Sequence, residues 1–260
     1  MILGNDLFGR NKEDIALGRL REFCPPEGYY VAFSGGKDSV VIKHLSDRAG
    51  VKYDAHYALT TIDPPEVVWF IRRKHPDVEV VRPAKPLLQE LISRGFPTRW
   101  HRWCCEYLKE RQSSNRVTVT GVRREESARR KGRPVVETCE RRGIRLVNPI
   151  VDWTTEDVWR YIRGYELPYC CLYDEGWPRL GCVLCPMGST ELAEREMERW
   201  PKLAAAWRRA FDRLYERRTV DGKKCVAQWN SGDEMFNWWL TIGREGRPVK
   251  ITEGQVGLYL

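Results

Sequence analysis

At 260 residues the chain is long enough for one α/β domain with an appendage, and its 42% hydrophobic and 31% charged residues are typical of a folded, soluble protein. No stretch has the length of a membrane span and residues 1–14 lack the apolar core of a signal peptide, so we expect a cytoplasmic protein with no membrane partner. Nine cysteines in a reducing compartment are expected to be thiols or metal ligands rather than disulfides, and the net charge of +8 favours partners that carry phosphate.

The first 120 residues alternate between strand-like and helix-like segments. We expect strands at 29–33, 53–59, 78–81 and 116–120, and helices at 11–22, 39–49, from Pro64-Pro65 through 71, around 87–92 and at Tyr107-Leu108. This alternation predicts a parallel sheet covered by helices on both faces. Ligands of such sheets bind at the carboxyl ends of the strands, where Ser34, Thr60, Thr61 and Gly121 fall.

The loop Ser34-Gly35-Gly36-Lys37-Asp38-Ser39 joins the first predicted strand to its helix. A glycine turn that opens a helix binds anions, because glycine permits close backbone approach and the first helical N–H groups attract negative charge. Lys37 adds a positive charge, Ser34 and Ser39 add hydroxyls, and Asp38 could hold Mg²⁺ or its water. The loop is not a Walker loop, since that motif needs a glycine where Val31 stands and a Ser or Thr where Asp38 stands.

The character of the chain changes after Asn148-Pro149. Thr154 is the expected N-cap of a helix that begins near Trp153, with Asp157 in the reciprocal position of a capping box. An irregular cysteine-rich segment at 167–188, helices at 191–199 and 202–218, and a tryptophan-rich end follow. We therefore expect a nucleotide-binding α/β domain at 1–150 and a helical region with metal ligands at 151–260.

The cysteines differ in their expected roles. Cys182 and Cys185 form a tight C-x-x-C, and the tandem pair Cys104-Cys105 lies far upstream of it. Thiolates at this spacing suit iron–sulfur clusters and zinc alike, although no neighbouring histidine pair completes a mixed zinc site. The alternatives for the fourth ligand are Cys139, Cys170 and Cys171, whereas Cys24 and Cys225 are expected to be ordinary small residues.

Residues 123–145 are strongly basic, with nine arginines and lysines against four glutamates. Such a density could serve the phosphates of a nucleotide, the backbone of a nucleic acid, or both. The alternative is a solvated, mobile loop.

Four landmarks in chain order resemble the phosphoadenosine phosphosulfate (PAPS) reductase family, within the pyrophosphate-loop (PP-loop) superfamily of adenine nucleotide α-hydrolases. They are residues 34–39, 104–109, 121–130 and 148–153, and they span about residues 29–188. The resemblance implies a Rossmann-like α/β fold, a twisted parallel sheet flanked by helices, with a cysteine-containing helical extension.

The third landmark is similar to the family's G-[IV]-R-x-x-E-S-x-x-R signature. By that match Arg123 and Arg130 would hold nucleotide phosphates, and Glu126 and Ser127 would order the loop after Gly121. The cysteine pattern resembles the 4Fe–4S ligand set of the family's iron–sulfur branch, which makes zinc the alternative.

Two departures from the family's sulfate-reducing members bear on function. Those members have a degenerate phosphate loop, whereas this chain keeps Lys37 and Asp38. They also carry a nucleophilic cysteine near the C-terminus in an E-C-G-hydrophobic-H motif, whereas the last cysteine here is Cys225. Both differences favour a member that hydrolyses ATP to AMP and pyrophosphate.

We therefore expect an ATP pyrophosphatase that activates an acceptor for iron–sulfur-assisted sulfur transfer. The amides of Gly35 and Gly36, with Lys37 and Ser39, would cradle pyrophosphate, and Asp38 would place Mg²⁺. At the end of the second strand, Thr60, Thr61 and Asp63 would border the adenosine.

The expected partners are an adenine nucleotide, a sulfur or electron donor protein, and an acceptor that could be tRNA or DNA. The first alternative is a reductase that releases sulfite from adenylyl sulfate (APS) or PAPS, and the second is a non-catalytic nucleotide- or nucleic-acid-binding module. The oligomeric state, a homodimer included, stays open.

Overall fold

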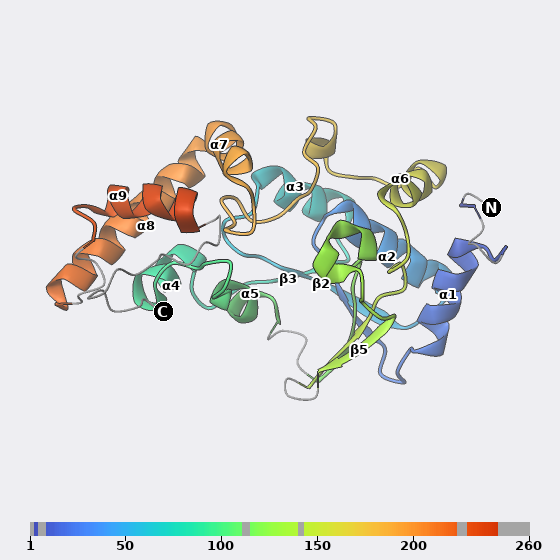
Figure 1. The fold of residues 1–260 in the computed structure, drawn as a ribbon. Coiled ribbons are helices and arrows are strands. Elements are labelled where there is room, and N and C mark those ends of the chain that lie inside the picture. Colours follow the sequence, from blue (N-terminus) through green and yellow to red (C-terminus); the bar gives the residue numbers. More distant parts are fainter. Residues whose placement is uncertain (1–2, 5–8, 111–114, 140–142, 223–227, 244–260) are drawn as a thin grey trace. The chain divides into compact units, whose positions relative to one another are not determined.

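The structure is a computed structural model that describes residues 3–4, 9–110, 115–139, 143–222 and 228–243 (Figure 1). The chain divides into two compact units. The first contains residues 1–59, 65–82 and 109–181, and the second contains 60–64, 83–108 and 182–260. Both units therefore draw on both sides of residue 150, where the sequence predicted a single boundary.

The described part of the first unit forms one six-stranded sheet in the order β3-β2-β1-β4-β6-β5. The strands are β1 (Tyr29–Ala32), β2 (Tyr53–Ala58), β3 (Glu79–Val81), β4 (Val117–Val119), β5 (Val136–Cys139) and β6 (Ile144–Val147). All neighbouring pairs are parallel except β5 and β6. The predicted α/β fold, a largely parallel sheet flanked by helices, is confirmed.

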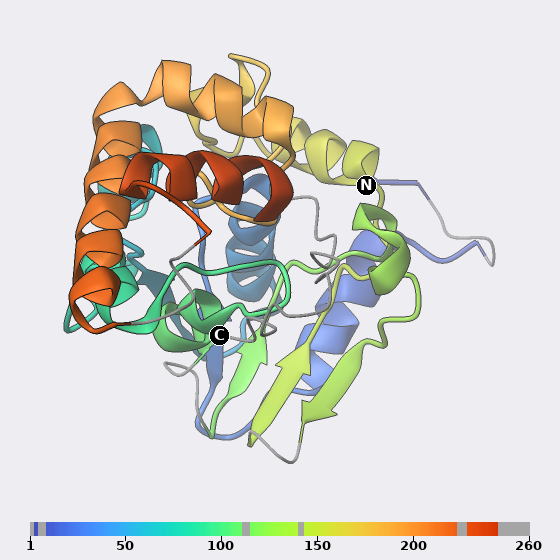
Figure 2. The same cartoon turned by 60° about the vertical axis from the view of Figure 1, so that its left-hand side comes forward.

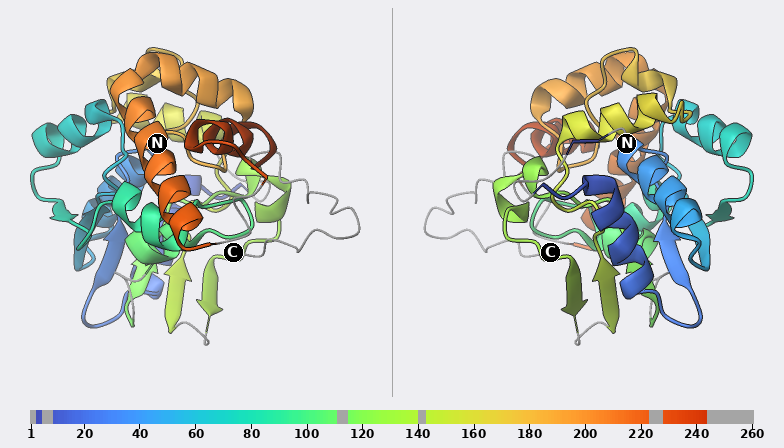
Figure 3. Two further views of the ribbon diagram at one scale, coloured as in Figure 1. Left: turned by 90° about the vertical axis from the view of Figure 1, so that its left-hand side faces the viewer. Right: turned by 90° about the vertical axis from the view of Figure 1, so that its right-hand side faces the viewer.

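The helices of this unit are α1 (Lys12–Glu22), α2 (Lys37–Ala49), α3 (Pro65–Lys74) and α6 (Thr155–Gly164). Helix α2 packs against both α1 and α6, and Figure 3 shows α1 and α2 side by side. The predicted capping box at α6 is confirmed, because Thr154 Oγ1 accepts the N–H of Asp157 and Asp157 Oδ2 accepts the N–H of Thr154. This box fixes the start of α6, which lies near the loop discussed below.

The basic segment 123–145 is not the mobile loop that was one alternative for it. Two 3₁₀ turns, η2 (Arg124–Glu126) and η3 (Ala128–Arg130), open the segment, and β5 and the first half of β6 follow. Val136 pairs with Val147 at one end of the antiparallel ladder and Cys139 pairs with Ile144 at the other. Because β6 also joins β4, the segment extends the sheet by two strands that the sequence analysis missed.

The second unit is helical. Its elements are α4 (Leu87–Arg94), α5 (Trp103–Leu108), α7 (Thr190–Arg199), α8 (Pro201–Val220), α9 (Gly232–Trp238) and a π-helical turn, η7 (Trp239–Gly243). Helix α8 packs against α4, α7 and α9, and Figure 2 shows α8 and α9 together. Within the described ranges, no helix combines the length and apolarity needed to cross a membrane.

The core of the second unit is aromatic. The rings of Trp207 and Trp239 stack with centroids 4.9 Å apart, and those of Phe96 and Phe211 stack at 5.7 Å. Trp239 is fully buried, and its Nε1–H donates to the carbonyl of Pro97 at 2.7 Å. A buried indole that finds such a partner adds both packing and a hydrogen bond. Trp239 is therefore a packing residue of this core.

Candidate functional site

The loop between β1 and α2 has a backbone that requires glycine. Gly35 has φ +73°, and a Cβ built there would lie 3.0 Å from Val67 Cγ1 and Ile71 Cδ1 of α3. Any side chain would therefore collide with the helix as well as strain the backbone. Gly36 is the N-cap of α2 and supplies no side-chain hydrogen bond, so the first N–H groups of the helix face the loop.

The two serines of the loop brace it from inside. Ser39 Oγ donates to the carbonyl of Gly36 at 2.8 Å, and Ser34 Oγ donates to Ser39 Oγ at 3.3 Å. The N–H of Gly36 in turn donates to Ser34 Oγ at 3.4 Å. These bonds hold the turn in one shape, as a preformed anion site requires.

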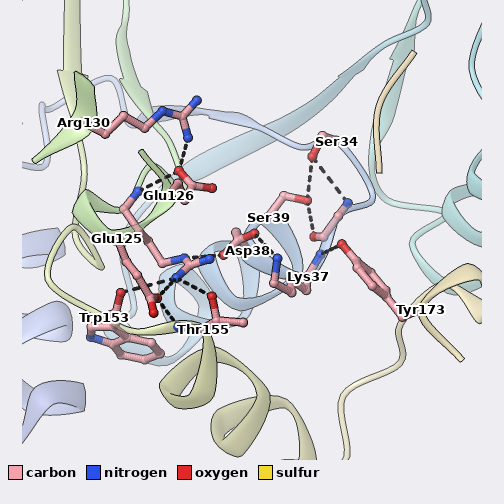
Figure 4. A network of polar contacts seen from close by, with 12 residues as sticks. Ser34, Lys37, Asp38, Ser39, Glu125, Glu126, Arg130, Trp153, Thr155 and Tyr173 are labelled. Atoms are coloured by element: carbon pink, nitrogen blue, oxygen red, sulfur yellow. Dashed lines mark hydrogen bonds and ion pairs between the residues drawn. The ribbon is translucent and has the colours of Figure 1, made fainter. Parts of the chain in front are cut away.

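Alternating positive and negative side chains begin in this loop, within the first unit (Figure 4). The ammonium of Lys37 lies 3.2 Å from Asp38 Oδ2, and Asp38 Oδ1 accepts from Nε of Arg123 at 2.7 Å. Lys37 and Arg123 are both buried, with 6% and 1% of their surface exposed. Buried charges of this kind are tolerated because each has an opposite charge beside it.

Gly121 lets Asp38 come this close to the neighbouring strand. A Cβ at Gly121 would lie 2.8 Å from Asp38 Cβ and 3.1 Å from its carbonyl carbon. Gly121 follows β4, whose Val119 pairs with Val31 of β1, so the two loops leave the same edge of the sheet from adjacent strands. The predicted placement of Ser34 and Gly121 at the carboxyl ends of parallel strands is confirmed.

Arg123 ties three further elements to Asp38. Its Nη1 donates to Glu125 Oε2 at 2.9 Å, to Thr155 Oγ1 at 3.2 Å and to the carbonyl of Trp153 at 3.4 Å. Glu125 Oε2 also accepts the N–H of Thr155, the first residue of α6. Arg123 therefore orients Asp38 and the start of α6, and its predicted contact with nucleotide phosphate stays a prediction.

The rest of the predicted signature forms a smaller network beside Arg123. Glu126 Oε2 accepts the N–H of Arg123 at 3.2 Å and pairs with the guanidinium of Arg130, whose own N–H donates to the carbonyl of Ser127 at 2.9 Å. The Arg130 side chain remains 38% exposed. Glu126 bonds within this segment through its carboxylate and Ser127 through its backbone carbonyl, and their predicted role at a nucleotide site stays a prediction.

The structure brings most predicted nucleotide-site residues into one place in the first unit. Those residues are Ser34, Gly35, Gly36, Lys37, Asp38, Ser39, Gly121, Arg123, Glu126, Ser127 and Arg130.

Thr60, Thr61 and Asp63 belong to the second unit instead. Asp63 Oδ2 accepts the N–H of Thr60 at 2.7 Å, and Thr61 Oγ1 accepts the N–H of Leu87 at 3.0 Å. Thr60 Oγ1 also accepts a hydrogen bond from the thiol of Cys182 at 3.4 Å. These residues therefore form a turn beside the cysteine-rich loop, and their predicted contact with adenosine stays a prediction.

Four of the candidate metal ligands lie in the second unit. Cys104 and Cys105 belong to α5, and Cys182 and Cys185 to the loop before α7. A hydrogen bond with Cys105, burial, and the nearby thiols of Cys185 and Cys182 raise the pKa of Cys104 far above its usual value. The thiols of Cys105, Cys182 and Cys185 thus lie near enough to Cys104 to affect its pKa.

The 4Fe–4S cluster expected at these four cysteines, with zinc as the alternative, stays a prediction. Among the described residues, no three His, Cys, Asp or Glu side chains are grouped tightly enough to hold one metal ion.

Two residues that the sequence analysis missed hold the C-x-x-C loop. Leu184 has φ +59°, and its N–H donates to buried Glu196 Oε2 at 2.6 Å. Arg99 donates from Nε to the carbonyl of Pro186 at 2.9 Å and from Nη2 to that of Gly188 at 2.8 Å. Left-handed geometry at a leucine costs about 1 kcal/mol or more and persists where its surroundings fix it. No local pattern around Arg99 or Glu196 marks this role.

The alternative fourth ligands lie in the first unit. Cys139 ends β5, and its side chain is outside the described part of the structure. Cys170 is buried, and burial raises the pKa of its thiol to about 11, while Cys171 beside it is exposed. Cys170 is the N-cap of the 3₁₀ turn η5 (Cys171–Tyr173), and the Tyr173 hydroxyl accepts the N–H of Lys37 in the loop at 34–39.

The family comparison matches the part of the chain that contains these features. The model of the phosphoadenosine phosphosulfate reductase domain matches residues 28–188. An adenosine 5′-phosphosulfate reductase of Bacillus cereus is 26% identical over 181 residues, which are 65% of this chain and 77% of the relative. An uncharacterised protein of Methanocaldococcus jannaschii is 32% identical over 205 residues, 72% of this chain and 48% of the relative. The chain thus spans about half the length of the archaeal relatives that it matches.

A solved structure shares the fold. It is a phosphoadenylyl-sulfate reductase from Candida auris in complex with phosphate, with TM-score 0.51 and 21% sequence identity, covering 64% of this chain and 87% of that one. At this identity the similarity shows the fold.

Proposed function

Since the chain belongs to the phosphoadenosine phosphosulfate reductase family, we propose that it is an ATP pyrophosphatase that prepares an acceptor for sulfur transfer. In this reaction an acceptor oxygen attacks the α-phosphorus of ATP, the bond from that phosphorus to the bridging oxygen breaks, and pyrophosphate leaves. The acceptor oxygen keeps the AMP group. When a sulfur atom then attacks the acceptor, AMP leaves together with that oxygen.

The observation that carries the proposal is the intact charge chain from Lys37 through Asp38 to Arg123 at the N-terminus of α2. A leaving pyrophosphate gains negative charge, and a lysine with oriented helix N–H groups stabilises that charge. Asp38 is fixed from two sides, so it can hold Mg²⁺ or its water in one position. A loop that received only an already activated sulfate would not need a site for departing pyrophosphate.

The proposal gives the four cysteines of the second unit a supporting role. Cys104, Cys105, Cys182 and Cys185 would hold a 4Fe–4S cluster, which would supply a site for sulfide or electrons when bound. The chain's own contribution is positional, since Arg99 and Glu196 keep Cys182 and Cys185 in a fixed turn. A separate sulfur or electron donor protein would deliver what is transferred.

A nucleic-acid acceptor is the part of the proposal that the structure supports least. Arg123, Arg130 and Arg133 of the basic segment pair with Asp38, Glu126 and Glu137 respectively. Contacts to a tRNA or DNA backbone would therefore fall to exposed residues such as Arg124, Arg129 and Lys131. Affinity for nucleic acid that weakens as salt is added is the expected result, and no affinity at low salt would remove this acceptor class.

The alternative function is an adenylyl-sulfate reductase, favoured by the name of the Bacillus cereus relative. That reaction breaks the sulfur–oxygen bond of the adenylyl sulfate, consumes two electrons from a thiol donor and releases sulfite and AMP. It needs no ATP and no pyrophosphate release, so the two activities are separable in one assay.

The test uses the anaerobically purified full chain with Mg²⁺-ATP, and in parallel with APS or PAPS and a dithiol. We expect pyrophosphate release that Lys37→Ala lowers by about two orders of magnitude, since one charge-stabilising group is worth that much. Lys43→Ala is the matched control, because Lys43 lies on the same helix and pairs with Asp77 away from the loop. Sulfite release without ATP consumption would establish the reductase instead.

A further inference from the structure

Tyr173 reaches the PP-loop although no motif of the sequence points to it. Its hydroxyl oxygen accepts the backbone N–H of Lys37 at 2.9 Å (Figure 4). That N–H is the first of helix α2, and the N-cap Gly36 offers it no side-chain acceptor. A Cβ built on Gly36 would lie 3.4 Å from the same hydroxyl. Tyr173 therefore sits directly on the helix N-terminus that the proposed function assigns to phosphate.

The tyrosine is held there from several sides. Its ring meets that of Trp159 of α6 edge-on at 5.1 Å, and the ammonium of Lys37 lies 5.7 Å from its centroid. Its own N–H donates to the carbonyl of Cys170 at 3.1 Å, which closes the turn η5. A phenol is neutral at pH 7, so the Tyr173 oxygen accepts this hydrogen bond as an uncharged hydroxyl.

A phosphate oxygen bound at the start of α2 would compete with the Tyr173 hydroxyl for the N–H of Lys37. A phosphate oxygen carries charge, and N–H bonds to ionised oxygens are about twice as strong as bonds to a neutral hydroxyl. A phosphate placed at the start of α2 also gains from the helix dipole, whereas the neutral phenol gains little. A ligand with an oxyanion at this point can thus displace the hydroxyl, but its net affinity is lowered by the bond it breaks.

We propose that Tyr173 is a specificity residue of the PP-loop, an internal competitor for the phosphate oxygen that would bind the N–H of Lys37. This inference rests on the proposed function and deepens it. Ligands with a diphosphate in the cradle must displace the hydroxyl, whereas AMP, which has no phosphate at that point, is not affected. After the reaction the hydroxyl returns to the amide and favours release of pyrophosphate.

The test is calorimetric titration of the full chain with inorganic pyrophosphate and Mg²⁺, and separately with AMP. Tyr173→Phe keeps the ring and removes the acceptor, so we expect its Kd for pyrophosphate to fall by about 2- to 10-fold, the value of one ordinary hydrogen bond. Its Kd for AMP stays unchanged. Tyr169→Phe is the matched control, because the Tyr169 ring also packs on Trp159 but its hydroxyl donates to Asp174. This variant should leave the Kd for pyrophosphate and the Kd for AMP unchanged.

An unchanged or weaker affinity of Tyr173→Phe for pyrophosphate, with circular dichroism showing a folded chain, would overturn the inference. The proposed function fails by a different result. In that case the parent protein shows no ATP turnover, although its pyrophosphate affinity still changes with Tyr173→Phe. If neither the parent nor the variant binds pyrophosphate, the loop is no phosphate site and both proposals fall.

Discussion

Replacing Arg123 by glutamine is expected to destabilise the first unit far more than the same change at Arg130. The Arg123 guanidinium has 2% of its side chain exposed and binds the carboxylates of Asp38 and Glu125 at 2.7 and 2.9 Å. Glutamine keeps part of the volume but carries no charge. Both carboxylates would then lose a counter-charge in a poorly solvated place.

The size of the effect follows from how exposed each partner is. Breaking a buried pair by removing one member costs about 3–5 kcal/mol. Asp38 retains Lys37 at 3.2 Å and is 19% exposed, while Glu125 is 48% exposed, so the lower end, about 3 kcal/mol, is expected. The Arg130–Glu126 pair is 38% and 27% exposed, and removing it costs about 0–1 kcal/mol.

Urea unfolding followed by circular dichroism measures both values, with the slope m compared to establish that the unfolded states match. Arg123→Lys should fall between the parent and Arg123→Gln, because an ammonium keeps the charge but cannot reach all the acceptors of the planar guanidinium. Equal losses for Arg123→Gln and Arg130→Gln would refute the reasoning, since they would mean that burial of the Arg123 pair carries no cost when broken.

Three further predictions concern the remaining parts of the molecule. Gly121→Ala places a methyl group 2.8 Å from Asp38 Cβ. It should weaken Mg²⁺-ATP binding, measured by calorimetry, by about 10-fold or more, which is equivalent to about 1.4 kcal/mol. Gly132→Ala, whose methyl group would lie in open space, should leave this binding unchanged. Burial lowers the pKa of His75 to about 4, so its neutral form is stabilising above pH 6.5 and that stability is lost as pH falls towards 4. His75→Phe should flatten the pH dependence of the urea midpoint in this window by up to about 3 kcal/mol, and an unchanged profile would contradict the assignment. Arg99→Ala removes the donors to the carbonyls of Pro186 and Gly188 and should lower the iron content per chain after anaerobic reconstitution. Arg209→Ala, on the exposed face of α8, should leave the iron content unchanged. Equal iron content in the two variants would exclude the positioning role of Arg99.

The strands that the sequence analysis found have a clear apolar pattern, either contiguous or alternating. Tyr29–Ala32 is a contiguous apolar run, Tyr53–Ala58 alternates apolar and polar residues, and each is followed by a helix. Strands β5 and β6 lack this signal because arginines and glutamates surround a few apolar residues. Their pairing comes from tertiary structure, since β6 is stabilised by β4, which is distant in sequence, as well as by β5.

The phosphate loop was predictable because its chemistry is local. Its glycines, lysine and serines are consecutive, and the geometry of the turn follows from them. One partner of the loop was not predictable, since Tyr173 lies 136 residues from Lys37 along the chain and belongs to no motif. Thr60 and Asp63 show the converse, as their position after β2 predicted an adenosine contact while their hydrogen bonds serve the unit that contains the C-x-x-C loop.

The segments of the second unit alternate along the chain with those of the first unit, and this affects the order in which the two units can fold during synthesis. A ribosome releases residues 60–64 and 83–108 early, but the helices that bury them begin only after residue 182. Until then α5 emerges with its adjacent thiols and without the loop that completes their surroundings. The first unit, whose segments end at residue 181, can fold first, as N-terminal domains usually do during synthesis. Cys104 and Cys105 can therefore meet Cys182 and Cys185 only after most of the chain has been synthesised.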